Sequence, residues 1–322
     1  MILKNINYLF FQFSFTKALH SINIFLLLYY IPYFLQEIKM KKKIISTLCI
    51  LLVLLGIIFI NIINKPLVGK ELLKNQQFIA HALGAIEDYT YTNSKEAFLY
   101  NYEQGIRLFE VDLSITTDNH FVCRHDWLDH MFPILGQEKI IDEDNAPLSL
   151  EQFKSLPIHN KYTSISLLEL LELLQEHKDA YIILDTKSVH TESIEQDYKL
   201  LIDTVNSLDK KLLDRIIPQI YNREMFATIS KFYNFPTVLY TLYQEAASND
   251  EALEFAIENN ISALVMSMDR FSEDFISKLN ENNILSYVHT INEEGMFDYL
   301  TSVGVTGIYT DFLNPSVLNL NN

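Results

Sequence analysis

From residue 78 onward, short apolar runs alternate along the chain with longer amphipathic stretches. This alternation is typical of parallel strands joined by crossover helices. The apolar runs predict eight strands, at residues 78–82, 107–113, 181–185, 216–220, 237–241, 263–266, 285–290 and 307–310. Between them we expect helices that include residues 95–104, 166–176, 193–207 and 250–259. Eight strands within about 250 residues favour an α/β fold of the (β/α)₈ TIM-barrel type.

A ninth apolar run, residues 121–124, follows the second predicted strand after the turn Thr117-Asp118-Asn119. That turn is too short for a helical crossover, so we expect a hairpin that carries His125 over the barrel mouth. Residues 127–165 then form the longest irregular connection, with Pro147 and Pro157 inside it. A connection of this length predicts either a lid or a disordered excursion.

The N-terminal part has a different pattern. Residues 44–63 contain no charged side chain, and this run is long enough to span a bilayer. Lys41, Lys42 and Lys43 directly precede it, which predicts a cytoplasmic N-terminal end and an extracytoplasmic remainder. No small-x-small cleavage pattern follows, which favours an uncleaved signal anchor. A buried core helix is the alternative.

A shorter apolar stretch, residues 21–35, is either a second span or part of an upstream extension, since Met40 is a natural start for a signal anchor. We therefore divide the chain into three parts. Residues 1–39 are a hydrophobic extension, residues 40–70 are the transmembrane signal anchor, and residues 71–322 are the barrel domain.

Charge separates these parts as well. The whole chain carries −16, while residues 1–70 hold eight Lys and one Glu, hence +7, so the remainder carries −23. Such an acidic domain is a poor candidate for binding nucleic acid through its general field. An anionic substrate would need a metal ion and a local lysine to reverse the sign inside the cleft. The two cysteines, Cys49 and Cys123, give no disulfide framework.

Two carboxylates stand out at the end of the second predicted strand. Glu110 and Asp112 are two residues apart, so they point to the same side of a strand. Two carboxylates on one face repel each other and resist burial, and a hard divalent cation between them relieves both costs. The alternative is an exposed Glu-x-Asp pair on a solvated strand face.

Barrel enzymes carry their chemistry at the carboxyl ends of the strands. Read off the predicted strands, those ends hold His81, Glu110, Asp112, Asp185, Lys187, Gln219, Thr241, His289, Asn292 and Asp311. Carboxylates, imidazoles and a lysine would thus point at one mouth. A metal ion beside an imidazole is a common arrangement for phosphoryl chemistry.

These residues lie in segments that resemble the glycerophosphodiester phosphodiesterase family over roughly residues 78–313. The resemblance is carried by IAHALG, TNSKEAF, FEVDLSITTDNHFVCRHD, LSLEQFKSLP, SISLLELLELL, ILDTK, YVHTIN and VTGIYTDF, in that order.

The resemblance implies a metal-dependent barrel that hydrolyses phosphodiesters. By position, Glu110, Asp112 and Asp185 would bind one divalent cation, Mg²⁺ or Ca²⁺. His81 and His125 would form the acid–base pair. Lys187 would contact the phosphate or the developing oxyanion.

Three positions depart from the family pattern. Ala82 stands where the family usually has arginine, Thr92 replaces a glutamate, and Asp185 replaces the usual third glutamate. The Asp-x-Lys segment is more similar to spider-venom sphingomyelinase D enzymes, which share the barrel. These changes keep the reaction class and leave the glycerol-diester substrate open.

We therefore expect a membrane-anchored, extracytoplasmic phosphodiesterase that acts on a lipid-derived diester or on a glycerophosphate polymer of an envelope. One alternative is a sphingomyelinase D-like phospholipase that forms a cyclic phosphate. The other is a barrel that has lost catalysis and binds envelope polymer. We expect His289 to be a packing residue, Asp126 to orient His125, and Trp127 either to stack on the substrate or to seat the lid.

Overall fold

The computed structural model describes residues 51–55, 68–243 and 246–318. The chain divides into two compact units, Met1–Lys65 and Pro66–Asn322. In the first unit, residues 51–55 are helical, and the rest of the predicted span at residues 44–63, like the stretch at residues 21–35, lies outside the described residues. A search of the described part of the chain finds no helix with the length and apolar character needed to cross a membrane.

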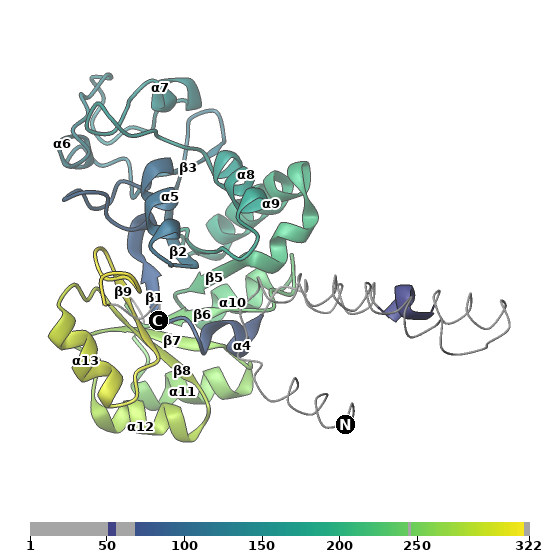
Figure 1. Ribbon diagram of the computed structural model, residues 1–322. Coiled ribbons are helices and arrows are strands. Elements are labelled where there is room, and N and C mark those ends of the chain that lie inside the picture. The colour runs from purple at the N-terminus through teal and green to yellow at the C-terminus, as the bar shows by residue number, and fades with distance from the viewer. Residues whose placement is uncertain (1–50, 56–67, 244–245, 319–322) are drawn as a thin grey trace, which may run out of the picture. The chain divides into compact units, whose positions relative to one another are not determined.

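The second unit is a closed barrel of eight parallel strands, as the sequence predicts (Figure 1). Pairing of the first strand with both the last strand and the second strand closes the ring. The strands are β1 (Phe78–Ala80), β2 (Leu108–Ile115), β4 (Tyr181–Asp185), β5 (Ile216–Ile220), β6 (Leu239–Thr241), β7 (Ala263–Ser267), β8 (Leu285–His289) and β9 (Gly307–Thr310). The strands are buried on both faces. Side chains on the inner face fill the barrel, and the helices cover the outer face.

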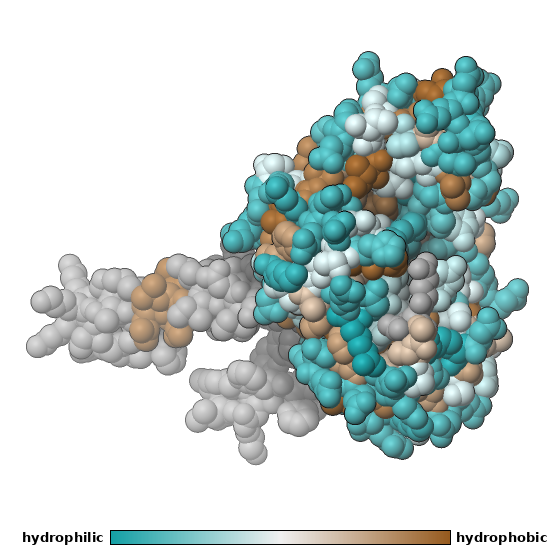
Figure 2. Space-filling view, turned by 180° about the vertical axis from the view of Figure 1, so that it is seen from behind, coloured by the Kyte–Doolittle hydropathy of each residue, from teal (hydrophilic) through white to brown (hydrophobic). Residues whose placement is uncertain are grey.

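The crossover helices bury their apolar sides against the strands in one large cluster. They are α5 (Lys95–Glu103), α8 (Leu167–Glu176), α9 (Thr191–Leu208), α10 (Arg223–Ile229), α11 (Asn249–Glu258), α12 (Glu273–Glu281) and α13 (Glu294–Ser302), with the 3₁₀ segment η2 (Lys210–Arg215) after α9. Several begin at a serine whose hydroxyl accepts a backbone N–H. At Ser166 and Ser248 this bond belongs to a complete capping box. Figure 2 shows hydrophilic residues over most of one face of the molecule, with apolar residues in separate patches.

The base of the barrel, where the strands begin, is filled by the short helix α4 (Gly69–Leu73). Leu72 and Leu73 pack into the barrel interior among residues from the strand starts. The Tyr287 hydroxyl lies 3.0 Å from the carbonyl oxygen of Leu73 and 2.7 Å from that of Gln76. The helix therefore closes the end of the barrel opposite the strands' carboxyl ends.

The predicted hairpin is also present. β3 (Phe121–Cys123) pairs antiparallel with the end of β2, with Cys123 opposite Leu113. The hairpin extends β2 beyond the barrel and brings residue 125 back over the mouth.

Residues 127–165 are not the disordered excursion that the sequence allowed. They contain α6 (Met131–Ile134) and α7 (Leu150–Lys154) and bury two small apolar clusters. The clusters comprise Val122, Phe132, Leu148 and Phe153, and Met131, Leu135, Ile158 and Tyr162. Apolar side chains spaced along the segment give this insertion its own core, so it forms an ordered cap beside the mouth.

Candidate active site

Three carboxylates converge at the mouth, as the sequence predicts. Glu110 and Asp112 lie on β2, and Asp185 ends β4 directly opposite Asp112 in the strand register. One oxygen from each of the three lies within 4.8 Å of the others. Glu110 is 3 % exposed and Asp112 is 2 % exposed, so the alternative of a solvated surface pair is wrong. The parallel register of β2 and β4 brings the acids together.

Lys187 supplies positive charge to this cluster. Its Nζ lies 2.6 Å from Asp112 Oδ1 and 2.5 Å from Asp185 Oδ2. The other oxygen of Asp185 accepts a hydrogen bond from the Tyr221 hydroxyl. Burial opposes the charged form of Lys187, but Asp112 and Asp185 outweigh it and raise the pKa of the ammonium above its usual range. The lysine is therefore a permanent cation against two of the three acids.

The carboxylates respond differently to their surroundings. Burial, together with the charge of Asp112, raises the pKa of Glu110, whose Oε2 accepts the backbone N–H of Ala82 at 2.7 Å. Burial also acts to raise the pKa of Asp112, but the nearby Lys187 ammonium outweighs it and holds that pKa below its usual range. Like charges in one buried site thus remain costly, and one cation nearby offsets only part of the repulsion.

The donor set suits a hard divalent cation. All three groups are carboxylates, the ligands preferred by Mg²⁺ and Ca²⁺. Metal–oxygen bonds of about 2.0–2.6 Å place two ligands of one ion up to about 5 Å apart, which the observed 4.8 Å limit satisfies. The three acids could therefore hold one ion.

His81 is oriented by a residue that follows the last strand, β9, which is the other neighbour of β1. It follows β1 in a 3₁₀ turn, η1 (His81–Leu83), and its Nδ1 lies 2.8 Å from Asp311 Oδ1. Asp311 is fixed in turn, because its Oδ2 accepts the Asn292 side-chain amide at 2.8 Å. Burial opposes the charged imidazole, but the hydrogen bond to Asp311 and the charge of Glu110 outweigh it and raise the pKa of His81 to about 9.

His125 follows the hairpin and is more exposed. Its Nδ1 lies 2.6 Å from Asp126 Oδ2, so the expectation that Asp126 orients this ring agrees with the geometry. Tyr91 lies beside both imidazoles, with its ring edge-on to His81 at 4.9 Å and to His125 at 5.5 Å between centroids. The two histidines therefore flank one aromatic ring at the mouth.

Sequence reasoning missed Asn93 and the role of its loop. The Asn93 amide donates to Asp112 Oδ2 at 2.9 Å, and its oxygen accepts the Asp112 backbone N–H at 3.1 Å. The residue is fully buried and has a φ of 46°, a conformation that asparagine tolerates better than most residues. The sequence held one signal for Asn93. It lies in the segment TNSKEAF, next to Thr92, which departs from the family pattern.

Ala82, which stands where the family usually has arginine, contributes to the site through its backbone. Ala82, Leu83 and Gly84 all have positive φ, which turns the Ala82 N–H toward Glu110. At Gly84 an added Cβ would collide with the Asn101 amide, whose Nδ2 also donates to the Leu83 carbonyl. The turn after β1 thus serves the acid cluster through its main chain rather than through a side-chain cation.

The insertion is attached to the His125 loop through Arg124, which is 1 % exposed. Its Nε donates to the Asp126 carbonyl at 2.7 Å and its Nη1 to Gln137 Oε1 at 2.9 Å. The Trp127 indole donates to the Ile115 carbonyl at 2.8 Å, and its ring contacts Phe153 of the insertion. Trp127 therefore seats the insertion on the hairpin.

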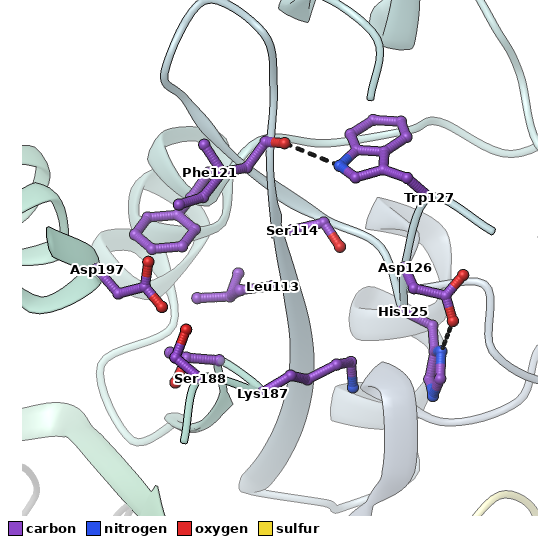
Figure 3. Close-up of a pocket in the computed structure, with 11 residues that line it drawn as sticks. Leu113, Ser114, Phe121, His125, Asp126, Trp127, Lys187, Ser188 and Asp197 are labelled. Carbon is purple, nitrogen blue, oxygen red and sulfur yellow. Dashed lines mark hydrogen bonds and ion pairs between the residues drawn. The ribbon is translucent and has the colours of Figure 1, made fainter. Parts of the chain in front are cut away.

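A cavity of about 280 Å³ opens beside His125 and Lys187 (Figure 3). Its walls come from β2, the hairpin, the loop after β4 and helix α9. The residues around it are Leu113, Ser114, Ile115, Phe121, His125, Asp126, Trp127, Thr186, Lys187, Ser188 and Asp197.

Three further polar residues at the strand ends, Gln219, Thr241 and His289, are buried or packed against other side chains. Gln219 accepts a hydrogen bond from the Tyr309 hydroxyl at 2.6 Å inside the barrel, and Thr241 is buried. His289 packs edge-on against Tyr243 and Tyr309, as expected for a packing residue.

Comparison with known proteins agrees with this geometry. The sequence profile of the glycerophosphoryl diester phosphodiesterase family matches residues 84–314. No curated protein matches the chain.

Solved structures share the fold at low sequence identity. A glycerophosphodiester phosphodiesterase from Parabacteroides distasonis has a TM-score of 0.61 and 19% identity, over 76% of this chain and 96% of that one. The enzyme from Thermotoga maritima has a TM-score of 0.58 and 15% identity, over 77% and 99%. A phosphodiesterase from Oleispira antarctica, in complex with the product sn-glycerol-3-phosphate, has a TM-score of 0.61 and 17% identity, over 76% and 97%.

The profile match covers more than half of the chain and includes the three convergent acids and His125, while His81 lies just before its first residue. The chain therefore belongs to the glycerophosphoryl diester phosphodiesterase family and is, by that membership, a phosphoric diester hydrolase.

Proposed function

We propose that the protein hydrolyses a glycerophosphodiester, with one divalent cation, Mg²⁺ or Ca²⁺, held by Glu110, Asp112 and Asp185. The observation that carries this proposal is the convergence of two buried acids and the half-buried Asp185 beside two carboxylate-bonded histidines. The substrate is a lipid-derived diester or a glycerophosphate polymer of an envelope. The bound product of the Oleispira antarctica relative supports a glycerol-phosphate moiety.

The two histidines would divide the proton transfers. A carboxylate can only accept, so Asp311 and Asp126 favour a proton on Nδ1 of His81 and His125 and leave each Nε2 for the reacting groups. One ring would take the proton of the nucleophile and the other would donate to the leaving oxygen. Lys187 would contact the phosphate. When bound, the cation supplies positive charge that neutralises the phosphodiester.

The test is a substrate screen of the full-length protein in detergent, with glycerophosphodiesters and lysophospholipids, with and without EDTA. Hydrolysis that EDTA abolishes and that added Mg²⁺ or Ca²⁺ restores would support the proposal. Phosphorus NMR of the product separates an open monoester from the cyclic phosphate of the sphingomyelinase D-like alternative. No turnover of any diester with either metal would favour the non-catalytic binding barrel.

We also propose that the protein is anchored in the membrane through residues 44–63, with the barrel domain outside the cytoplasm. The support is the uncharged run and the Lys41–Lys43 cluster before it. Val317 is 55% exposed, so a Val317→Cys variant offers a reactive thiol near the C-terminus, while Cys123 is buried. An impermeant maleimide should label this variant on intact cells. Labelling only after lysis would refute the orientation.

A further inference from the structure

The cavity beside His125 ends at a buried acid that the proposed hydrolysis does not use. Asp197, on helix α9, is 6% exposed and lines the cavity with Ser188, whose side chain hydrogen-bonds to it. Figure 3 shows Asp197 and Ser188 side by side, at the end of the cavity away from His125. Within the described residues, no lysine, arginine or histidine forms an ion pair with this carboxylate. A buried acid without a cationic partner is expensive for a protein to keep.

The same cavity also contains a buried hydroxyl group that has no hydrogen-bond partner. The Thr186 hydroxyl is buried, lines the cavity and has no hydrogen-bond partner. The remaining walls are largely apolar or aromatic, from Leu113, Phe121 and Trp127. Buried polar groups normally find partners, so the unbonded Thr186 hydroxyl and the Asp197 carboxylate, which has Ser188 but no cation beside it, point to a ligand that completes both.

Lys187 and Asp126 line the cavity near His125, with Asp126 bonded to the His125 ring. Asp197 is the acid at the other end (Figure 3). The Lys187 ammonium faces the catalytic acids rather than Asp197. A phosphate placed at Lys187 would therefore lie at the His125 end, and any substituent extending along the cavity would reach Asp197. Figure 3 shows the aromatic ring of Phe121 on the Asp197 side of the cavity. An aromatic ring next to a carboxylate is a favourable environment for an alkylated ammonium group.

We propose that this cavity binds a cationic amino-alcohol substituent of the phosphodiester, with its ammonium group at Asp197. The proposal rests on the proposed phosphodiesterase function and specifies its substrate as a zwitterionic diester. At about 280 Å³, the cavity falls just below the range of about 300–1,000 Å³ typical of pockets for drug-sized ligands, so it suits a headgroup rather than a long acyl chain.

The first test compares two soluble substrates, glycerophosphocholine and glycerophosphoglycerol. The wild type should have the higher kcat/KM for glycerophosphocholine. Asp197→Asn keeps the side-chain shape and removes the charge, so it should lower that value about tenfold or more, mainly through KM, because charged contacts are the stronger ones. The value for glycerophosphoglycerol should stay the same. The matched control is Asp203→Asn, an exposed acid on the same helix, which should change neither value.

The second test measures binding without turnover. Choline should inhibit glycerophosphoglycerol hydrolysis by the wild type, whereas its neutral isostere 3,3-dimethyl-1-butanol should inhibit much less, and Asp197→Asn should lose the difference. Equal inhibition by the two compounds, or a normal glycerophosphocholine preference in Asp197→Asn, would overturn the headgroup proposal and leave the phosphodiesterase proposal standing. If no diester is turned over, calorimetric titration of choline into wild type and variant still decides between a cationic site and none.

Discussion

At the scale of single residues, His81 and His125 are each held in position by a different carboxylate. Each has Nδ1 against a carboxylate, Asp311 for one ring and Asp126 for the other. We expect His81→Ala and His125→Ala each to lower kcat by about 10²–10⁴-fold, the range for a general acid or base. The double variant should be little worse than either single variant, because the two rings act in one reaction.

The control for these variants is His130→Ala, since His130 is an exposed histidine in the neighbouring insertion. It should keep the wild-type rate. Circular dichroism should show the same fold in all variants. A His125→Ala protein with more than about a tenth of the wild-type rate would be incompatible with general acid–base catalysis by that ring.

His289 gives a different prediction, for stability against pH. Burial, reinforced by the charge of His81, lowers the pKa of His289 to about 4. An unfolded histidine titrates near pH 6.5, so between pH 6.5 and 4 the unfolded state binds a proton that the folded state does not. The contribution of His289 to stability is therefore complete above pH 6.5 and is lost as the pH falls toward 4.

His289→Phe removes this titration and keeps an aromatic ring against Tyr243 and Tyr309. Between pH 7.5 and 5, the wild type should lose about 2 kcal/mol more unfolding free energy than the variant, as measured by urea denaturation. Parallel losses in the two proteins would show that the pKa of His289 is the same in the folded and the unfolded states.

The acids and histidines were predictable because each lies at the end of an apolar run, where a strand's period of two fixes the side-chain direction. That rule placed Glu110 and Asp112 on one face, and the resemblance to the phosphodiesterase family supplied the roles of the acids and histidines. Asn93 and Asp197 were not predictable, because their positions depend on a loop with positive φ and on how far helix α9 rotates toward the hairpin. Such features follow from tertiary packing, which local patterns do not encode.

At the scale of elements, the hairpin and the insertion form one unit around Arg124. Arg124→Met keeps most of the side-chain volume but leaves the Asp126 carbonyl and Gln137 Oε1 without their donor. We expect a loss of about 1–3 kcal/mol in unfolding free energy, the usual cost of an unpaired buried polar group. We also expect a lower kcat, because the same contact positions the His125 loop.

The affinity for the activating cation should not change in this variant, since its proposed ligands lie on β2 and β4. Metal titration of activity measures this directly. Arg223→Met, at an exposed arginine that begins α10, is the matched control. It removes only a solvent-exposed hydrogen bond to the Glu251 carbonyl and a contact with the Phe255 ring, so it should lower stability by less than about 1.5 kcal/mol and leave the rate unchanged. A large shift in metal dependence for Arg124→Met would place its effect in the acid cluster instead.

The elements themselves followed from sequence more fully than their connections did. All eight barrel strands and the hairpin fall where the apolar runs predict them, because buried strands need such runs. The first strand stops at Ala80 rather than at residue 82, since Ala82 adopts a positive φ. For residues 127–165 the sequence left a lid and a disordered excursion both open, because the two small clusters join residues without a helical or strand period.

At the scale of the whole molecule, the barrel is closed at its base by α4. Leu73 is fully buried there, so Leu73→Ala should lower the unfolding free energy by about 2–5 kcal/mol through the cavity it leaves. The kcat measured well below the melting temperature should not change, because the site lies at the opposite end. Lys74→Ala, at an exposed neighbour, should change stability by less than about 0.5 kcal/mol. A parallel loss of kcat in Leu73→Ala would show that base and mouth are mechanically coupled.

The position of α4 also fixes where the barrel can be held. The chain that precedes residue 68 joins the domain at its base, behind the strand starts and away from His81 and His125. If the protein is attached through its N-terminus, to a bead or to a bilayer, the attachment point therefore lies at the end of the barrel remote from the active site. The mouth of the barrel then lies at the opposite end of the domain from the point of attachment.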